Sequence, residues 1–537
     1  MKAGYAFMND LTVIQASQGL LRYLVATLTT ESVSAAGVVV GHDHRHNSDS
    51  FARLTAAVFL SQGVKVYYYP DLVHTPLVPF AVKTLGAVAG IMITASHNPK
   101  NDNGYKVYWG NGCQIIPPHD KGIASKIIEN LVPWTWDYQL VETSSLCVRL
   151  GESIVKEYFD KIEKLCQHKE DNIASQVRIC YTAMHGVGFE FAKRAFERFG
   201  LPTLIPTEAQ VLPDPDFPTV EFPNPEEGKG SLALAFKTAE AHGAKVVFAN
   251  DPDADRFALA EQLPSGEWHV FSGNEIGTLF GCHLSQNLPH GKYAMLASTV
   301  SSKMLEYVGK ARGFRFEETL TGFKWLGNRA IDLESSEDYQ VLFAYEEAIG
   351  FMIGDIVRDK DGISALAVCG ELVVQLQKKE MTLFGYLDSL RREFGYFVSN
   401  NSYFVCHDPL TIKRIFERIR FGETPQSPFK YELQYPRVIG GSKVTAIRDL
   451  TIGYDSMQAD NKPVLPVSAS SEMITFRFEN GGVLTLRTSG TEPKIKYYSE
   501  LGGKTSEAAK AALDRIVEGF VNELMQPERN HLGYRKE

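Results

Sequence analysis

Three carboxylates at alternate positions are the sharpest chemical signal in the sequence. Residues 251–256 read DPDADR and directly follow an apolar run at residues 244–248. The side chains of Asp251, Asp253 and Asp255 bring like charges together, which is costly unless a cation neutralises them. Because ligand sets made only of oxygen suit Mg²⁺ or Mn²⁺, we predict a divalent metal site in this loop.

Two alternatives to this metal site stay open. An EF-hand calcium loop also begins with aspartates at alternate positions, but it requires glycine and glutamate where this chain has Arg256 and Gln262. The element that enters the loop is also a strand rather than a helix. The simpler alternative is an acidic turn that is exposed to solvent and binds no ion.

A serine hydroxyl lies in a second polar loop. Residues 94–99 read TASHNP and follow the apolar run at residues 90–93. The hydroxyl of Ser96 could act as a nucleophile or carry a phosphate group. A Ser-His-Asp hydrolase is also possible, although the G-x-S-x-G elbow is missing around Ser96, and His97 is not an obvious base because successive side chains diverge. An ordinary polar turn is the plainer alternative.

A third loop combines basic and hydroxyl groups. Residues 487–494 read RTSGTEPK and lie between two strand-like runs. A guanidinium, two hydroxyls, a glycine that frees backbone N–H groups, and the nearby Lys494 and Lys496 together suit a phosphate dianion. A hairpin loop with solvated charges is the alternative.

The remaining polar turns are weaker signals. Residues 346–350 read EEAIG after a strand-like run, so their acidic groups could accept hydrogen bonds from sugar hydroxyls. Residues 358–362 and 321–324, which read RDKDG and TGFK, fit ordinary loops equally well. Asp43 and Arg45 follow another apolar run and are most simply a local ion pair.

The elements that must position these loops follow a repeated pattern in the first two thirds of the chain. A short run rich in valine and isoleucine leads into a polar loop and then a helical pattern, as in residues 38–41 followed by residues 51–62. Such strands indicate mostly parallel sheets covered on both faces, in which ligands bind at the carboxyl ends of strands. After residue 394, short strands such as residues 473–478 predict an α+β domain with an antiparallel sheet.

The composition is that of a globular protein with several domains. The 537 residues are 44% hydrophobic and 22% charged, and the formal net charge is −9. This acidic balance argues against nucleic acid or an anionic membrane as the main partner. No apolar run reaches the roughly 18 residues that a membrane span needs, and the N-terminus lacks the apolar stretch of a secretory signal, so we expect a cytoplasmic protein.

Together, these loops resemble the signature loops of the α-D-phosphohexomutase superfamily. The four matching loops occur in the family's order, at residues 94–99, 251–256, 346–350 and 487–491. Further stretches, at residues 102–109, 316–325 and 491–498, are similar to its phosphoglucomutase-2 / phosphopentomutase branch. The resemblance covers almost the whole chain. It implies an isomerase that moves phosphate between the 1-position and the 5- or 6-position of a sugar, through a phosphoserine and a bisphosphate intermediate.

The resemblance also implies the architecture. We expect an α/β fold with four domains around a central cleft, of which three have mixed or parallel sheets and the C-terminal one is α+β. The expected domains are residues 1–147 with the phosphoserine, 148–270 with the metal, 271–395 for sugar recognition and 396–537 for phosphate binding.

Individual roles follow from the same resemblance. Ser96 would be phosphorylated and would bind one Mg²⁺ with Asp251, Asp253 and Asp255. The other implied catalytic residues are His97, Lys106 and Arg256, and either His97 or Lys106 would transfer protons. The implied substrate-binding residues are Lys324, Glu346, Ala348, Lys360, Arg487, Ser489, Gly490, Thr491 and Lys496. Glucose 1,6-bisphosphate or an equivalent sugar bisphosphate would be the activator, sugar phosphates the only partners, and a monomer the family default.

The sequence departs from the family pattern at two places. The family's sugar loop often reads Glu-Glu-Ser, whereas Ala348 stands at the serine position. A lost hydroxyl contact is worth about 0.5–1.5 kcal/mol, which favours a pentose over a hexose. The family's Gly-Thr-x-Gly-Leu-Arg segment would lie before Met1, so we expect the first domain to lack its arginine and an edge strand.

Two other functions stay open at this point. A glucose 1,6-bisphosphate synthase would use the same loops and would charge Ser96 from the acyl phosphate of a glycolytic intermediate. Asn98 and Pro99 favour the mutase, because the synthase relatives tend to vary there. A sugar-phosphate-binding protein with impaired catalysis is the third possibility, motivated by the missing N-terminal segment.

Overall fold

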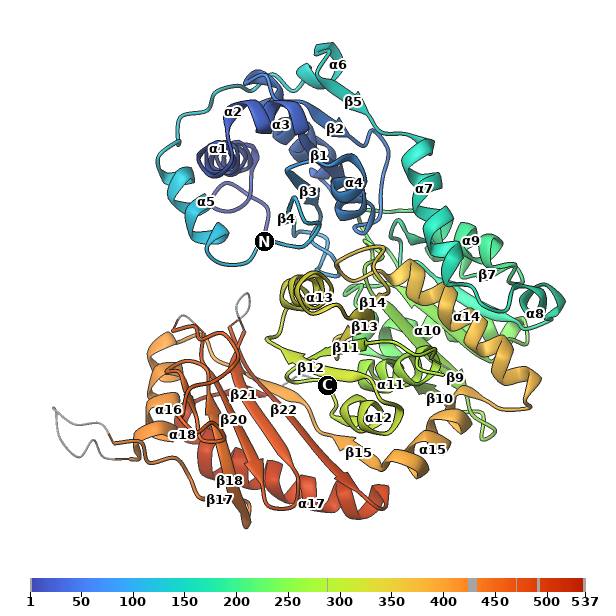
Figure 1. The fold of residues 1–537 in the computed structure, drawn as a ribbon, viewed down its shortest axis with the longest axis vertical. Helices are drawn as coiled ribbons and strands as arrows, with labels where there is room; N and C mark the ends of the chain where they lie inside the picture. The colour runs from blue at the N-terminus through green and yellow to red at the C-terminus, as the bar shows by residue number, and fades with distance from the viewer. Residues whose placement is uncertain (1, 287, 424–431, 470, 490–492, 535–537) are drawn as a thin grey trace. The chain divides into compact units, whose positions relative to one another are not determined.

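Apolar runs that end in polar loops become the central strands of three sheets (Figure 1). The computed structural model describes residues 2–286, 288–423, 432–469, 471–489 and 493–534. The chain forms two units, of which the first comprises Met1–Ser301 and Gly309–Leu387, and the second Ser302–Val308 and Asp388–Glu537. Helices α12 (Met304–Arg312) and α15 (Leu383–Phe394) contain points where the chain passes from one unit to the other.

The first sheet carries the serine loop and has the strand order β4-β3-β1-β2-β5. Helices α1 and α3 pack on one face and α4 on the other, where Gly41 and Gly90 admit the helix closely. A Cβ atom on Gly41 would lie 2.8 Å from Val78, and one on Gly90 would lie 2.6 Å from Val82. The elements are β1 (Val38–His42), β2 (Val66–Tyr68), β3 (Ala89–Ile93), β4 (Tyr105–Trp109), β5 (Cys147–Arg149), α1 (Asp10–Thr27), α2 (Thr30–Ala36), α3 (Ser48–Ser61), α4 (Leu77–Leu85), α5 (His119–Ile128) and α6 (Leu140–Thr143).

The second sheet carries the aspartate loop and has the order β10-β9-β8-β6-β7. Every residue of its central strand β8 is buried, and the strand ends at Asn250, directly before Asp251. The elements are β6 (Ile179–Thr182), β7 (Ile205–Pro206), β8 (Val246–Asn250), β9 (Phe257–Gln262), β10 (Trp268–Val270), α7 (Glu152–Ile162), α8 (Lys169–Ala174), α9 (Gly188–Phe199) and α10 (Lys229–Ala241).

The third sheet carries the sugar loop and has the order β12-β11-β13-β14. Its elements are β11 (Tyr293–Ser298), β12 (Arg315–Thr319), β13 (Gln340–Glu346), β14 (Gly350–Ile353), α11 (Gly273–Leu284), α13 (Phe323–Glu337) and α14 (Gly362–Lys378). In each of the three sheets, the site loop joins two antiparallel neighbours, β3 to β4, β8 to β9 and β13 to β14. Such short connections cannot cross over a sheet, which is why these pairs are not parallel.

The second unit is built on one curled antiparallel sheet, with the order β17-β18-β20-β21-β22-β16-β23 and β15 and β19 paired at its sides. Apolar side chains of α16 and α17 pack with those of the sheet in one core. The elements are β15 (Tyr396–Ser399), β16 (Ser402–Val405), β17 (Val438–Ile439), β18 (Ser442–Asp449), β19 (Tyr454–Asp455), β20 (Met473–Phe478), β21 (Val483–Thr488), β22 (Lys494–Gly503), β23 (Gly533–Tyr534), α16 (Pro409–Phe421), α17 (Ser506–Gly519), a π-helical turn (Phe520–Met525) and α18 (Pro527–Asn530).

The predicted fold class is confirmed, because three α/β sheet domains precede a C-terminal α+β unit with an antiparallel sheet. Strand β5 pairs with β2, so the first sheet extends to Arg149. Among the helices in the described part of the chain, none has the length and apolar character that crossing a membrane would require.

Candidate active site

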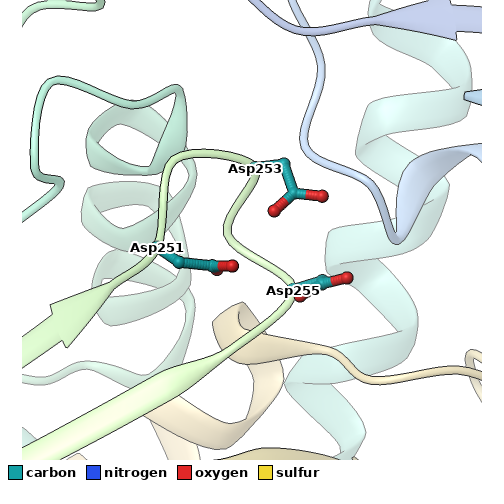
Figure 2. Close-up of side chains that lie close together, drawn as sticks. All are labelled: Asp251, Asp253 and Asp255. Carbon is teal, nitrogen blue, oxygen red and sulfur yellow. The ribbon is translucent and has the colours of Figure 1, made fainter. Parts of the chain in front are cut away.

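The three aspartates lie together in the connection between β8 and β9. Their side chains are fully buried, and one carboxylate oxygen from each lies within 4.8 Å of the others (Figure 2). Ala254, between two of them, has a positive φ of 51°, which turns the chain so that Asp251, Asp253 and Asp255 converge. Burying three like charges at this spacing is unfavourable without a counter-charge.

The free oxygen atoms of this triad fit a divalent cation. Oδ1 of Asp253 and Oδ1 of Asp255 are buried and have no hydrogen-bond partner among the described residues. Buried carboxylate oxygens are rarely left without a partner unless they bind an ion. Asp251, Asp253 and Asp255 would therefore hold Mg²⁺, which when bound would offset the negative charge of a phosphoryl group.

Two lysines supply part of the counter-charge. Nζ of Lys106, on β4, lies 2.7 Å from Asp253 and 2.9 Å from Asp255, and Nζ of Lys360 lies 3.1 Å from Asp255. Burial alone would raise the pKa of Asp253, but the Lys106 ammonium lowers it below its ordinary value. Burial, followed by the neighbouring carboxylates of Asp253 and Asp255, raises the pKa of Asp251 well above its ordinary value. The negative charge of Asp251 is thus the one in the triad that the protein compensates least.

Ser96 is placed directly against this triad. It follows β3, and its Oγ donates a hydrogen bond to Oδ2 of Asp251 at 3.0 Å. The φ of Ser96 is 54°, in the left-handed region that is unfavourable for a residue with a side chain. Non-glycine residues in such conformations cluster at active sites, where the surrounding structure holds them.

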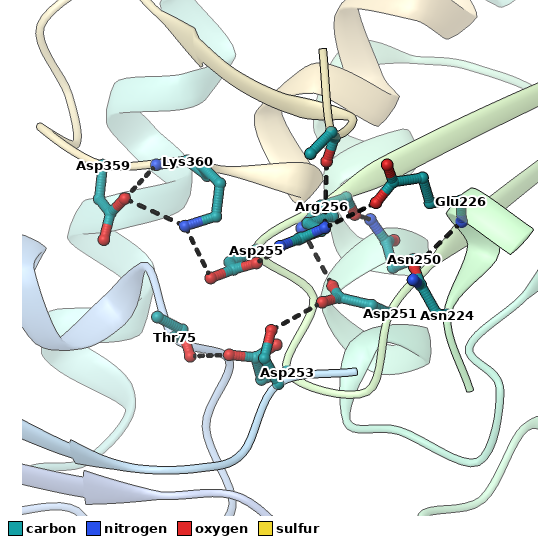
Figure 3. A network of polar contacts seen from close by, with 12 residues as sticks. Thr75, Asn224, Glu226, Asn250, Asp251, Asp253, Asp255, Arg256, Asp359 and Lys360 are labelled. Carbon is teal, nitrogen blue, oxygen red and sulfur yellow. Dashed lines mark hydrogen bonds and ion pairs between the residues drawn. The ribbon is translucent and has the colours of Figure 1, made fainter. Parts of the chain in front are cut away.

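Arg256 joins the aspartate loop to the sugar loop. Its backbone N–H donates to Oδ1 of Asp251 at 3.0 Å, and its Nη1 donates to the carbonyl oxygen of Ala348 at 3.2 Å and to Glu226 at 3.4 Å (Figure 3). The half-buried ring of His97 is close enough for the Arg256 charge to act on it. Burial first, and then Arg256, hold the pKa of His97 well below its ordinary value.

The sugar loop lies at the end of β13. Glu346 accepts a hydrogen bond from the backbone N–H of Gly322 at 2.6 Å. Burial, followed by the charge of Glu347, raises its pKa to about 7. Lys324 is not brought to the triad by any contact described, and its Nζ lies 5.6 Å from the ring centre of Trp325.

A pH-dependent stability follows from Glu346. Its ordinary pKa is 4.5, so between that value and about 7 the folded carboxyl group keeps a proton that the unfolded chain has released. The contribution of Glu346 to stability is therefore lost as the pH rises through about 7. We expect Glu346→Gln to raise the free energy of unfolding by on the order of 1 kcal/mol near pH 8 and to leave it almost unchanged near pH 4.

Urea unfolding of the two proteins at both pH values measures this effect. The exposed Glu208 gives the control, since Glu208→Gln should change stability at neither pH. If Glu346→Gln changes the free energy of unfolding equally at both pH values, the raised pKa of Glu346 is contradicted.

The predicted phosphate loop lies in the second unit. Nη2 of Arg487, at the end of β21, donates to the hydroxyl oxygen of Tyr498 at 3.0 Å. The backbone N–H of Ser489 donates to the carbonyl oxygen of Lys494 at 2.9 Å, and Lys496 pairs with Arg487 across β21 and β22. Gly490 and Thr491, predicted for the same site, lie outside the described residues.

The structure also shows polar residues that the sequence analysis did not propose. The hydroxyl of Thr75 donates to Asp253 at 2.5 Å, and its backbone N–H donates to the Asp253 carbonyl oxygen at 3.0 Å. Oδ1 of Asp359 lies 3.3 Å from Nζ of Lys360, and Oδ2 of Asp359 accepts from the hydroxyl of Tyr108 at 2.9 Å (Figure 3 shows Thr75, Asp359 and Lys360). Both contacts join distant parts of the chain, so no local signal in the sequence indicates them.

Comparison with known proteins identifies the family. The phosphoglucomutase/phosphomannomutase description matches this chain in three parts: α/β/α domain I at residues 1–131, domain II at residues 156–264 and domain III at residues 272–390. The chain belongs to the phosphoglucomutase/phosphomannomutase family. The superfamily expected from the four loops is therefore confirmed.

Individual relatives confirm the branch of this family. The chain is 49% identical to the phosphopentomutase of Mus musculus over 99% of its own length and 87% of the mouse protein. It is 45% identical to the glucose 1,6-bisphosphate synthase of Homo sapiens, over 100% of this chain and 88% of the human protein. Among solved structures, parafusin, a phosphoglucomutase from Paramecium in its open form, matches with a TM-score of 0.70 at 19% identity, over 96% of this chain and 92% of that one. This last likeness shows the shared fold.

Proposed function

We propose that this chain is a phosphopentomutase that also has phosphoglucomutase activity. It would move phosphate between the 1- and 5-positions of a pentose phosphate and, more slowly, between the 1- and 6-positions of a hexose phosphate. The observation that carries the proposal is the 3.0 Å contact of Ser96 Oγ with Asp251, within a triad whose free oxygens fit Mg²⁺. The identity to a phosphopentomutase along nearly the whole chain supports the same reaction.

In the first half of the reaction, phosphorylated Ser96 donates its phosphoryl group. The bond between Oγ and phosphorus breaks while the free 5-hydroxyl oxygen of ribose 1-phosphate bonds to phosphorus. That hydroxyl loses its proton to the enzyme, and the released Oγ of Ser96 takes up a proton. The product is ribose 1,5-bisphosphate. After it turns around, its 1-phosphoryl group is transferred to the Oγ of Ser96, which gives up its proton. The 1-oxygen of the sugar is protonated, and ribose 5-phosphate leaves.

Two residues are candidates for transferring the proton. His97 has a pKa well below its ordinary value because of burial and Arg256, so its neutral ring can accept a proton. Lys106 contacts Asp253 and Asp255, which raise its pKa above the ordinary value against the effect of burial. A lysine held in the charged form is better suited to stabilise the negative charge of the phosphoryl group. We therefore assign proton transfer to His97 and charge stabilisation to Lys106.

Substrate binding is assigned to several polar and charged residues. Glu346 would accept hydrogen bonds from sugar hydroxyls, and Lys360 and Arg256 would contribute positive charge. Lys324, which lies on α13, would contribute a further positive charge. Anion binding is assigned to the second unit, to Arg487, Ser489, Gly490, Thr491 and Lys496. The absence of a hydroxyl at Ala348 supports a preference for pentose, since one hexose contact is lost.

The remaining expectations stay predictions. These are activation by glucose 1,6-bisphosphate or an equivalent sugar bisphosphate, a cytoplasmic location, a monomeric state, and sugar phosphates as the only partners. The division into domains at residues 1–147, 148–270, 271–395 and 396–537 is likewise a proposal.

A second candidate function is glucose 1,6-bisphosphate synthesis. It is favoured by the 45% identity to the human synthase over the full length of this chain. The same Ser96 would then take its phosphoryl group from an acyl phosphate and pass it to a sugar monophosphate. The two functions differ in the donor and in the fate of the bisphosphate.

One assay separates these functions. The purified protein is incubated with Mg²⁺ and ribose 1-phosphate or glucose 1-phosphate, first with a trace of glucose 1,6-bisphosphate and then with 1,3-bisphosphoglycerate. We expect ribose 5-phosphate to form with the trace activator, with a higher kcat/KM for the pentose. Accumulation of bisphosphate only with the acyl phosphate would establish the synthase instead, and binding without turnover would overturn both.

A further inference from the structure

A buried arginine holds the backbone of the loop that carries Ser96. Arg45 follows β1, and its Nη2 donates to the carbonyl oxygens of Ser96 at 2.5 Å and Asn98 at 2.6 Å. Its Nη1 donates to the carbonyl oxygens of Pro99 at 2.9 Å and Asp102 at 3.4 Å. A single guanidinium therefore satisfies four backbone acceptors in one irregular loop.

The arginine is itself fixed on several sides. Its Nε lies 3.2 Å from Oδ2 of Asp43, and both side chains are completely buried. Oδ1 of Asp43 accepts from the backbone N–H of Arg45 at 3.1 Å and from the hydroxyl of Ser48 at 2.6 Å. The ring of Phe217, from the second sheet's half of the unit, lies 5.1 Å from the guanidinium carbon. A guanidinium held in this way has little freedom to leave the loop.

This contact set differs from that of a local ion pair. An ion pair between Asp43 and Arg45 would stabilise only the turn after β1, whereas the four carbonyl contacts reach about fifty residues along the chain. Buried carbonyl groups need donors, and a loop has no neighbouring strand to provide them. The planar, five-donor geometry of arginine can serve several carbonyls at once.

The loop held by Arg45 has a conformation that it would not adopt unaided. Ser96 has a φ of 54°, and its hydroxyl points to Asp251 at 3.0 Å. Strained residues persist only where their surroundings determine the backbone. Since Arg45 contacts the carbonyl group of Ser96 itself, it acts on the strained peptide directly.

We propose that Arg45 is a positioning residue that keeps the Ser96 hydroxyl at the aspartate triad. The expected effect of Arg45 on turnover rests on the proposed function. The expected effect of Arg45 on the conformation of the serine loop does not depend on the reaction. Asp43 orients the guanidinium, and Phe217 covers it, so that the serine loop is fixed by contacts from both the first and the second sheet's parts of the unit.

Hydrogen exchange tests the effect on the loop. The amides of Thr94, Asn98 and Asp102 donate to carbonyl groups within the loop or beside it, at 3.1, 3.1 and 3.0 Å. Their exchange rates therefore measure how firmly the loop keeps its conformation. In Arg45→Met, we expect these amides to exchange about 10-fold faster or more, while those of β8 and β9 stay unchanged. Arg53, a partly exposed arginine on α3, provides the control, because Arg53→Met should not change exchange at residues 94–104.

Kinetics test the effect on the reaction. A misplaced nucleophile loses rate rather than substrate affinity, so kcat should fall about 10²-fold in Arg45→Met, with KM within about 3-fold of its original value. Arg45→Lys should recover part of both effects, because an ammonium group can serve some of the four carbonyls. A uniform loss of stability would instead speed exchange throughout the unit.

Each outcome decides the proposal. Unchanged exchange at residues 94–104 with unchanged kcat would overturn it, as would a rise in KM alone. If Arg45→Met does not fold, Arg45→Lys and Asp43→Asn are read by the same two measurements. If the unsubstituted protein has no mutase activity, the proposed function fails, while the exchange of the loop amides still shows whether Arg45 holds the loop.

Discussion

Ser96→Ala will reduce mutase turnover by at least about 10⁴-fold, because the Oγ of Ser96, 3.0 Å from Asp251, is the atom that carries the phosphoryl group in the proposed mechanism. The phosphoryl group has no carrier without this oxygen, and the substrate cannot exchange its two phosphates directly. The variant should still fold, since the Ser96 hydroxyl that it lacks donates one hydrogen bond, to Asp251. The measurement is the rate of ribose 5-phosphate formation, together with transfer of label from radiolabelled glucose 1,6-bisphosphate to the protein.

A matched serine separates this effect from general damage. Ser61, at the end of α3, donates only to the carbonyl oxygen of Val58, so Ser61→Ala should keep both turnover and labelling. Turnover that survives in Ser96→Ala, or label that remains on that variant at the same stoichiometry, would refute the phosphoserine mechanism.

Asp251→Asn will abolish the response of the protein to Mg²⁺. Burial, followed by Asp253 and Asp255, raises the pKa of Asp251, whereas the pKa values of Asp253 and Asp255 are lowered, so the protein compensates the charge of Asp251 least. At a Mg²⁺ concentration about 100 times its Kd, the unsubstituted protein should gain about 2.7 kcal/mol in the free energy of unfolding. The variant should gain less than about 0.5 kcal/mol, and its turnover should fall about 10³-fold or more.

Thermal and urea unfolding with Mg²⁺ and with EDTA measure this difference. Asparagine keeps the shape of Asp251, so the amide can still accept from the Arg256 N–H and the metal-free variant should be no less stable than the metal-free parent. Asp160, an aspartate on α7 that pairs with Lys156, gives the control, because Asp160→Asn should keep the full response to Mg²⁺. A full Mg²⁺ response in Asp251→Asn would exclude this carboxylate as a ligand.

The parts of the site that the sequence predicted are those with a local signature. The aspartates at alternate positions and Ser96 each follow a continuous apolar run, and such a run predicts both a buried strand and the edge where its loop lies. The contact between Ser96 and Asp251 joins two sheets, and it could be expected only because both loops follow carboxyl ends of strands. Spacing alone could not give the 3.0 Å distance.

The parts that the sequence did not predict depend on contacts between distant segments. Asp43 and Arg45 are two residues apart, so an ion pair was the simplest interpretation, but the guanidinium also contacts four carbonyls of the serine loop. Thr75 has no chemical motif around it and acquires its contact only when the first and second sheets meet. The antiparallel strand after each site loop was hidden because apolar runs do not reveal strand direction.

The left-handed backbone of the site loops has a consequence for directed evolution. Ser96, Ala254 and Ile349, one in each of the three site loops of the first unit, all have φ between 51° and 54°. Glycine would relax this backbone in the folded state but would enlarge the unfolded ensemble and loosen the loops. Variants selected for heat resistance and variants selected for catalytic speed should therefore diverge at these three positions.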